Sequence, residues 1–209
     1  MAKIGDNIMG AGQGKIGDVV IYSMHGKNFM RSKPSKYTDR KSEAQLAQRA
    51  KMQAVTGFMS PFRELIRKTY AGEAVGRAPY HAAKSEIMRK AVSGAYPDFS
   101  IDKLLVLLSK GPLPLPVEVS VALKDGGLLV EWSYSSEAEK RNSRDTLVVI
   151  AQNPDTGDCE YKFTGARRAD KNYQWMLNIP VSQNQQPDLW IAFRNPEETE
   201  MSDSVYVAF

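Results

Sequence analysis

The sequence predicts an α+β protein in which a β-hairpin and about three helices precede an antiparallel β-sandwich. Three observations lead to this prediction: a glycine-rich opening with a β-branched run, a stretch of helical periodicity, and a series of short strands beyond residue 101. The 209 residues, 42% hydrophobic and 25% charged, have the composition of an ordinary globular protein. We predict two parts, residues 1–96 and residues 97–209.

The N-terminal part opens with a predicted β-hairpin. Residues 1–31 contain six glycines, which indicates either a flexible arm or a run of turns with positive φ. Residues 18–24 are β-branched and aromatic, His25-Gly26 is a turn signal, and residues 27–31 can return as the second strand. An isolated hairpin is marginally stable in water, so we expect this one to pack on something.

Three helices are predicted to follow. Ser42 and Gln45 have capping-box spacing and begin a helix that runs to about residue 59. Pro61 and Pro79 each take the first position of a further helix, and the last helix runs to about residue 92.

The C-terminal part has the short, regularly spaced strands of a sandwich. Asp125-Gly126 between two alternating runs is a hairpin signal, and the apolar run at residues 104–109 is predicted as a further strand that precedes the sandwich. The predicted sandwich strands are residues 117–124, 128–134, 146–152, 160–164, 173–181, 189–194 and 204–209.

The two parts carry opposite charge. The whole chain has a formal charge of +4, but residues 1–95 hold 17 Lys and Arg against 7 Asp and Glu, and residues 96–209 hold 11 against 17. A basic part joined to an acidic part suggests an acidic partner for the first. That partner is nucleic acid, an anionic surface, or the acidic part of a neighbouring copy.

The candidate contact residues lie in the basic part. Residues 31–41 hold five cations and one acid, which fits either a solvated connector or a strip that contacts phosphates or carboxylates. Tyr37 is suited to stack on a base. The helical cations form either one basic face or scattered solubilising charge. The candidate interaction or phosphate-contacting residues are Lys27, Arg31, Lys33, Lys36, Tyr37, Arg40, Lys41, Arg49 and Lys51.

No catalytic residue, metal site, cofactor or small-molecule substrate is predicted. Two His and one Cys offer no zinc-site spacing. The glycines at residues 10–14 precede Lys15, but Ile16 stands where a phosphate-binding loop needs Ser or Thr. No run of about 18 apolar residues exists, so no membrane insertion is expected. The opening lacks a secretory signal pattern, which predicts synthesis in the cytoplasm, with a virion as the alternative final location.

The C-terminal part resembles a fibronectin type III domain of the immunoglobulin-like class. The resemblance is carried by residues 117–121, 127–132, 147–151, 189–196 and 202–207. It implies core positions for Trp132 and Trp190. Two features depart from that family: Leu189-Trp190 replaces the usual tyrosine, and the extra predicted strand precedes the expected start.

The whole chain is similar to an uncharacterised family of Bacteroidota proteins with a domain of unknown function. The matching stretches are residues 14–20, 31–34, 43–51, 91–102 and 202–207. This resemblance implies that hairpin, helices and sandwich occur together, and it implies no activity.

These observations favour a non-enzymatic structural or interaction protein that self-assembles or binds other proteins. A β-sandwich joined to a glycine-rich arm suggests a virion or tail component of a bacteriophage or prophage, since such arms tie subunits together. The alternative is a nucleic-acid-binding protein that uses the basic N-terminal part, and an enzyme ranks third.

Overall fold

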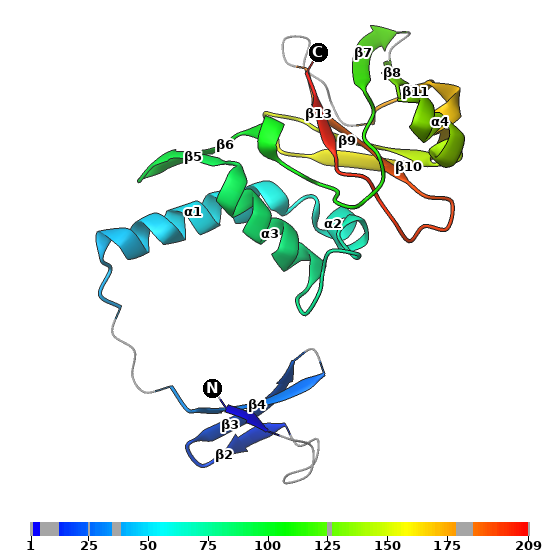
Figure 1. The fold of residues 1–209 in the computed structure, drawn as a ribbon. Coiled ribbons are helices and arrows are strands. Elements are labelled where there is room, and N and C mark those ends of the chain that lie inside the picture. Colours follow the sequence, from blue (N-terminus) through cyan, green and yellow to red (C-terminus); the bar gives the residue numbers. More distant parts are fainter. Residues whose placement is uncertain are drawn as a thin grey trace. The chain divides into compact units, whose positions relative to one another are not determined.

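The computed structural model describes residues 2–4, 13–24, 26–34, 39–124, 127–178 and 186–208, and the chain divides into two compact units, residues 1–43 and residues 44–209 (Figure 1). The predicted α+β class with an N-terminal hairpin is confirmed. The change of net charge near residue 96 does not coincide with the boundary between these units. The helices and the sandwich belong to the same unit.

The N-terminal unit is a four-stranded antiparallel sheet in the order β1-β4-β3-β2. Its centre is the predicted hairpin, and Gly26 in the turn has a φ of 70°, which a glycine adopts without strain. The flanking strands were not predicted because each has only three residues. The strands are β1 (Ala2–Ile4), β2 (Gly14–Ile16), β3 (Val19–Met24) and β4 (Lys27–Ser32).

The three predicted helices are present in the C-terminal unit. They are α1 (Glu43–Met59), α2 (Arg63–Thr69) and α3 (Pro79–Lys90). Pro79 begins α3 as predicted. The prediction for Pro61 was wrong: this proline lies in a turn, and α2 begins after Phe62 as its N-cap residue.

The sandwich consists of a three-stranded sheet, β11-β8-β7, and a four-stranded sheet, β10-β9-β12-β13, both antiparallel. The seven strands on two sheets are the architecture of an immunoglobulin-like sandwich. The helix α4 (Ser136–Asn142) connects β8 to β9. The strands are β7 (Glu118–Lys124), β8 (Gly127–Ser133), β9 (Thr146–Gln152), β10 (Cys159–Arg167), β11 (Asn172–Trp175), β12 (Asp188–Arg194) and β13 (Val205–Val207).

The four-stranded sheet is buried on both faces, which gives the C-terminal unit three layers (Figure 1). One face packs on the three-stranded sheet, and Trp132 lies in that core. The other face packs on α1, α2 and α3, and Trp190 lies there, fully buried. Both tryptophans therefore occupy core positions, in two different cores. Because both faces are covered, β9 and β12 are continuous apolar runs and do not alternate.

The segment between the helices and the sandwich differs from the prediction. The strand predicted at residues 104–109 is wrong: the 3₁₀ helix η1 (Lys103–Leu105) begins there, and the chain then runs on without pairing as a strand. Val106 and Leu108 are buried against the helices, whereas Leu104 and Leu105 are exposed. Residues 92–101 instead form a hairpin of β5 (Val92–Ala95) and β6 (Asp98–Ile101). A second 3₁₀ turn, η2 (Arg168–Asp170), precedes β11.

Two kinds of feature are absent from the described part of the chain. No helix in it is long and apolar enough to cross a membrane. Within the same residues, no group of three or more His, Cys, Asp or Glu is placed to hold a metal ion.

Candidate interaction surfaces

The strand register gives the N-terminal sheet two chemically different faces. Paired residues on neighbouring strands point to the same side of a sheet, and successive residues alternate. The register therefore defines an apolar face, formed by Ile16, Val19, Ile21 and Met30 with Ser23, Asn28 and Ser32. It also defines an aromatic face, formed by Lys15, Val20, Tyr22, Met24, Lys27, Phe29 and Arg31.

Among the described residues of the N-terminal unit, the sheet is the only layer of regular structure. Ile21 is 7% exposed and is the one fully buried apolar residue among those described in this unit, whereas Ile16 is 61% exposed. Val19 and Met30 are half-buried. A sheet needs a second layer to remove its apolar face from water, so this face is a candidate packing surface.

The aromatic face combines π-systems with cations. The rings of Tyr22 and Phe29 stack with centroids 5.6 Å apart and 21° between their planes. The Arg31 guanidinium carbon lies 5.8 Å from the centre of the Tyr22 ring. Lys15 and Lys27 are exposed on the same face. The Lys33 amide donates a hydrogen bond to the Asp18 carbonyl at 2.6 Å, so the chain leaves β4 beside the β2–β3 turn.

The candidate residues predicted from the sequence are not gathered in one place. Lys27 and Arg31 lie on the aromatic face. Lys33, Arg40 and Lys41 are exposed between β4 and α1, and Arg49 and Lys51 lie on α1. Lys36 and Tyr37 lie outside the described residues. Lys15, Tyr22 and Phe29 were not among the predicted site residues, because only the strand register brings them onto one face.

Six cations of α1, α2 and α3 fall into two groups. One group makes local contacts: Arg67 pairs with Glu64 at 2.7 Å, Arg63 lies 5.4 Å above the Tyr80 ring, and Lys68 lies 5.5 Å above the Phe163 ring. The other group lines a groove of about 420 Å³ between α1 and α3, which we call the basic groove. Its cations are Lys51, Lys84 and Arg89, with His81, Met52 and Met88 beside them.

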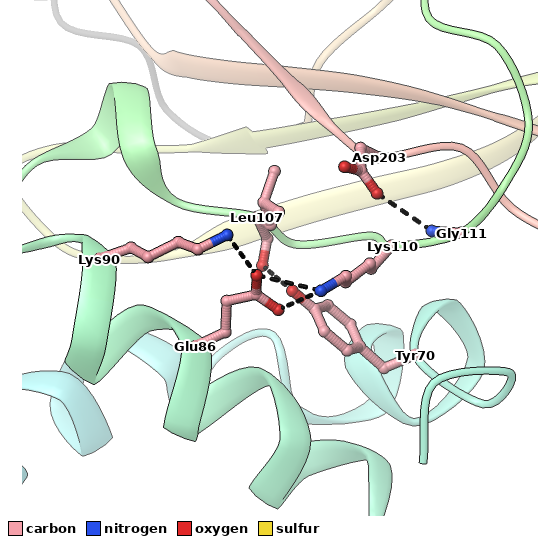
Figure 2. A network of polar contacts seen from close by, with 7 residues as sticks. All are labelled: Tyr70, Glu86, Lys90, Leu107, Lys110, Gly111 and Asp203. Carbon is pink, nitrogen blue, oxygen red and sulfur yellow. Dashed lines mark hydrogen bonds and ion pairs between the residues drawn. The ribbon is translucent and has the colours of Figure 1, made fainter. Parts of the chain in front are cut away.

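A polar network joins α3 to the chain segment that enters the sandwich (Figure 2). The Glu86 carboxylate accepts hydrogen bonds from Lys110 at 2.8 and 3.1 Å and from Lys90 at 2.8 Å. Burial by itself would raise the pKa of Glu86, but the bonds from Lys110 and Lys90 outweigh it and hold that pKa below its usual value. The network therefore keeps a buried carboxylate ionised.

Neighbouring polar groups support the same junction. The Tyr70 hydroxyl donates to the Leu107 carbonyl at 2.9 Å, and the Gly111 amide donates to Asp203 at 3.1 Å (Figure 2). Burial, and then the charge of Glu86, raise the pKa of Tyr70 well above its usual range. These contacts join α2 and α3 to the segment at residues 107–111 and to Asp203.

Three further side chains, Arg168, Asp145 and Cys159, are buried or partly buried and were not predicted as site residues. Arg168 is fully buried, lies 3.8 Å above the Phe193 ring and pairs with Asp145 at 3.4 Å. Burial raises the pKa of Asp145 and lowers that of Arg168. Burial also raises the pKa of the Cys159 thiol, which favours the unreactive protonated form. We assign structural roles to all three side chains.

Comparison with known proteins identifies a family and no individual relative. Residues 11–208 match the model of DUF6266, which is described as a family of unknown function. No curated protein and no solved structure matches the chain.

Proposed function

The chain belongs to the DUF6266 family of unknown function, and we propose that it is a non-enzymatic, self-assembling structural protein. In this proposal the apolar face of the N-terminal sheet packs on the same face of a second copy. The observation that supports it is the apolar face itself: the described residues of this unit form one sheet, and Ile16 on that face is 61% exposed.

The separation of charge between the two faces favours a second copy as the partner. Among the described residues of β2, β3 and β4, the cations Lys15, Lys27 and Arg31 are all on the aromatic face, and the apolar face carries no charge. Two apolar faces can therefore meet without bringing these cations together. Face-to-face packing of two small sheets produces a β-sandwich, and a symmetric pair uses the same patch twice.

The test compares two exposed apolar residues on opposite faces. Ile16 is 61% exposed on the apolar face, and Met24 is 51% exposed on the aromatic face. We expect Ile16→Lys to weaken self-association about tenfold or more, because it places a charge in an apolar contact. Met24→Lys, the matched control, should leave association unchanged. Sedimentation velocity across a range of protein concentrations measures both.

Two results would contradict the proposal. One is a wild-type protein that remains monomeric at every concentration. The other is an equal loss of association in both variants, which would mean that charge in general, and not the apolar face, governs contact between copies. Circular dichroism of each variant confirms that the sheet is intact.

Within this proposal the assembly is a virion or tail structure of a bacteriophage or prophage. A small terminal sheet that is joined to a larger sandwich suits a subunit that must be tied to its neighbours. Two observations test the assignment: whether the encoding gene lies among capsid and tail genes, and whether an antibody detects the protein in purified particles. A gene among unrelated neighbours and a protein absent from particles would reject it.

A further inference from the structure

We propose that the aromatic face of the N-terminal sheet binds single-stranded nucleic acid. Bases stack on Tyr22 and Phe29, and Lys15, Lys27 and Arg31 contact the phosphates. This site lies on the opposite face of the sheet from the proposed contact between copies, so the two proposals stand or fall separately.

Tyr22 and Phe29 form an aromatic pair at the centre of this face, where a base can stack. Tyr22 and Phe29 are directly paired across β3 and β4, the two central strands of the sheet. Both residues are half-buried, so part of each remains accessible to solvent. Stacking of a base on such a ring contributes about 1–3 kcal/mol and tolerates any base.

The cations lie on both sides of the aromatic pair. Counted along the strands, Lys15, Val20 and Arg31 form one row of side chains, Tyr22 and Phe29 form the next, and Met24 and Lys27 form the third. Successive rows on one face of a sheet are about 7 Å apart. A strand that crosses the sheet along β3 therefore meets a cation, then the rings, then another cation.

The chemistry of this face favours a single strand over an acidic protein. An acidic protein segment would use the cations and leave the ring faces unused, and a duplex hides the faces of its bases. Among the described residues, the aromatic face carries no carboxylate that would repel phosphate. The chain also continues from β4 with the exposed Lys33, Arg40 and Lys41, which extend the run of cations.

The test measures binding of the full-length protein to a fluorescently labelled oligo-dT of about 15 nucleotides, a length within the usual site sizes. Tyr22→Leu and Phe29→Leu keep an apolar side chain in the sheet but remove the aromatic face, and each should weaken binding about 5-fold to 100-fold. Tyr22→Phe should bind like the wild type. Arg31→Gln should weaken binding and reduce the dependence of log affinity on log salt by about one.

The matched control is in the basic groove, where Lys84→Gln removes a cation from a different basic surface. It should leave oligo-dT binding unchanged. Loss of binding in Lys84→Gln with retention in Tyr22→Leu would overturn the proposal and locate the site in the groove. Equal competition by poly-glutamate would also overturn it, because simple charge would then explain binding, and so would the absence of binding at low salt.

Discussion

At the scale of single residues, Glu86 joins α3 to the segment that enters the sandwich. Its side chain is 8% exposed, and those of its partners Lys110 and Lys90 are 29% and 53% exposed. We expect Glu86→Gln to lower the free energy of unfolding by about 1–3 kcal/mol, because charged hydrogen bonds are lost in a mostly buried place. Lys90→Met should cost less, since Lys90 is the more exposed partner. Urea unfolding of both variants measures the difference.

The same carboxylate predicts a dependence of stability on acid pH. The pKa of Glu86 in the fold lies below its ordinary value of 4.5. Its contribution is therefore complete above that value and is lost as the pH falls through the pKa in the fold. The wild type should lose stability more steeply than Glu86→Gln below about pH 4.5. Parallel curves for the two proteins would show that this carboxylate does not contribute.

Tyr206 predicts a dependence of stability on alkaline pH, because the fold favours the protonated form of this side chain. Burial first, and then its hydrogen bond to Asp188 at 2.9 Å, raise the pKa of Tyr206 to about 12, from 10.0. Between these values the unfolded chain releases this proton and the fold retains it, so stability falls as the pH rises. Tyr206→Phe should show a shallower loss over this range in alkaline unfolding. A loss as steep as that of the wild type would contradict the assignment.

Single residues differ in how far the sequence could identify them. Trp132 and Trp190 are large, apolar and set in strand patterns, so a core position was predictable for each. The sequence could not predict that the two tryptophans lie in different cores, because their placement depends on which face of the sheet the helices cover. Arg168 and Asp145 are separated by 23 positions and carry no motif, so their buried pairing has no signal in the sequence.

At the scale of elements, we expect substitution by alanine to have opposite effects on stability at two glycines. Gly57 lies inside α1, and a Cβ there would meet nothing within 4 Å. Gly57→Ala should raise stability by about 0.5–1 kcal/mol, because alanine restricts the unfolded chain and favours helix. A Cβ at Gly111 would overlap the backbone carbonyl of Met201, so Gly111→Ala should lower stability by about 1–3 kcal/mol. Thermal unfolding of the two variants tests the sign of each effect.

Apolar runs show why some elements were predictable and others were not. The runs in β9 and β12 are buried strands, as their β-branched and aromatic residues indicate. The run at residues 104–109 is rich in leucine and becomes a 3₁₀ turn followed by a buried connector. Both kinds of run bury apolar side chains, although Leu104 and Leu105 of the second run stay exposed, and only pairing partners elsewhere in the chain distinguish the two kinds. The strand β6 (Asp98–Ile101) was not predicted. Its partner strand, β5, begins directly after α3, where the sequence predicted that the helix continues to about residue 92.

At the scale of the whole molecule, the tryptophans make the two units separable by experiment. All three tryptophans, Trp132, Trp175 and Trp190, belong to the C-terminal unit, so their fluorescence follows that unit alone. Ile21→Asp should disrupt the N-terminal sheet in circular dichroism and change the tryptophan-detected free energy of unfolding by less than about 0.5 kcal/mol.

The positive control for that measurement is Phe62→Ala. The Phe62 ring lies 6.1 Å from that of Trp190 in the core between helices and sheet. This variant should lower the tryptophan-detected stability by about 3–5 kcal/mol. A comparable loss in Ile21→Asp would show that the two units unfold together.

The division into two units also shows where the net charge of the protein lies. Residues 1–43 hold eight Lys and Arg against four Asp and Glu, and residues 44–209 hold twenty of each. The basic helices and the acidic sandwich therefore balance within one unit. The formal excess of +4 lies on the N-terminal unit, which carries the two proposed contact surfaces.

The position of β9 and β12 between two layers affects how the protein is made. Their helical cover, residues 43–90, leaves the ribosome first, and the strands that it covers follow at residues 146–152 and 188–194. Synthesis proceeds at about 5–20 residues per second, so the apolar sides of the helices stay uncovered by β9 and β12 for several seconds. During that interval they are suitable targets for chaperones, and the C-terminal unit completes its core only after residue 194 has been synthesised.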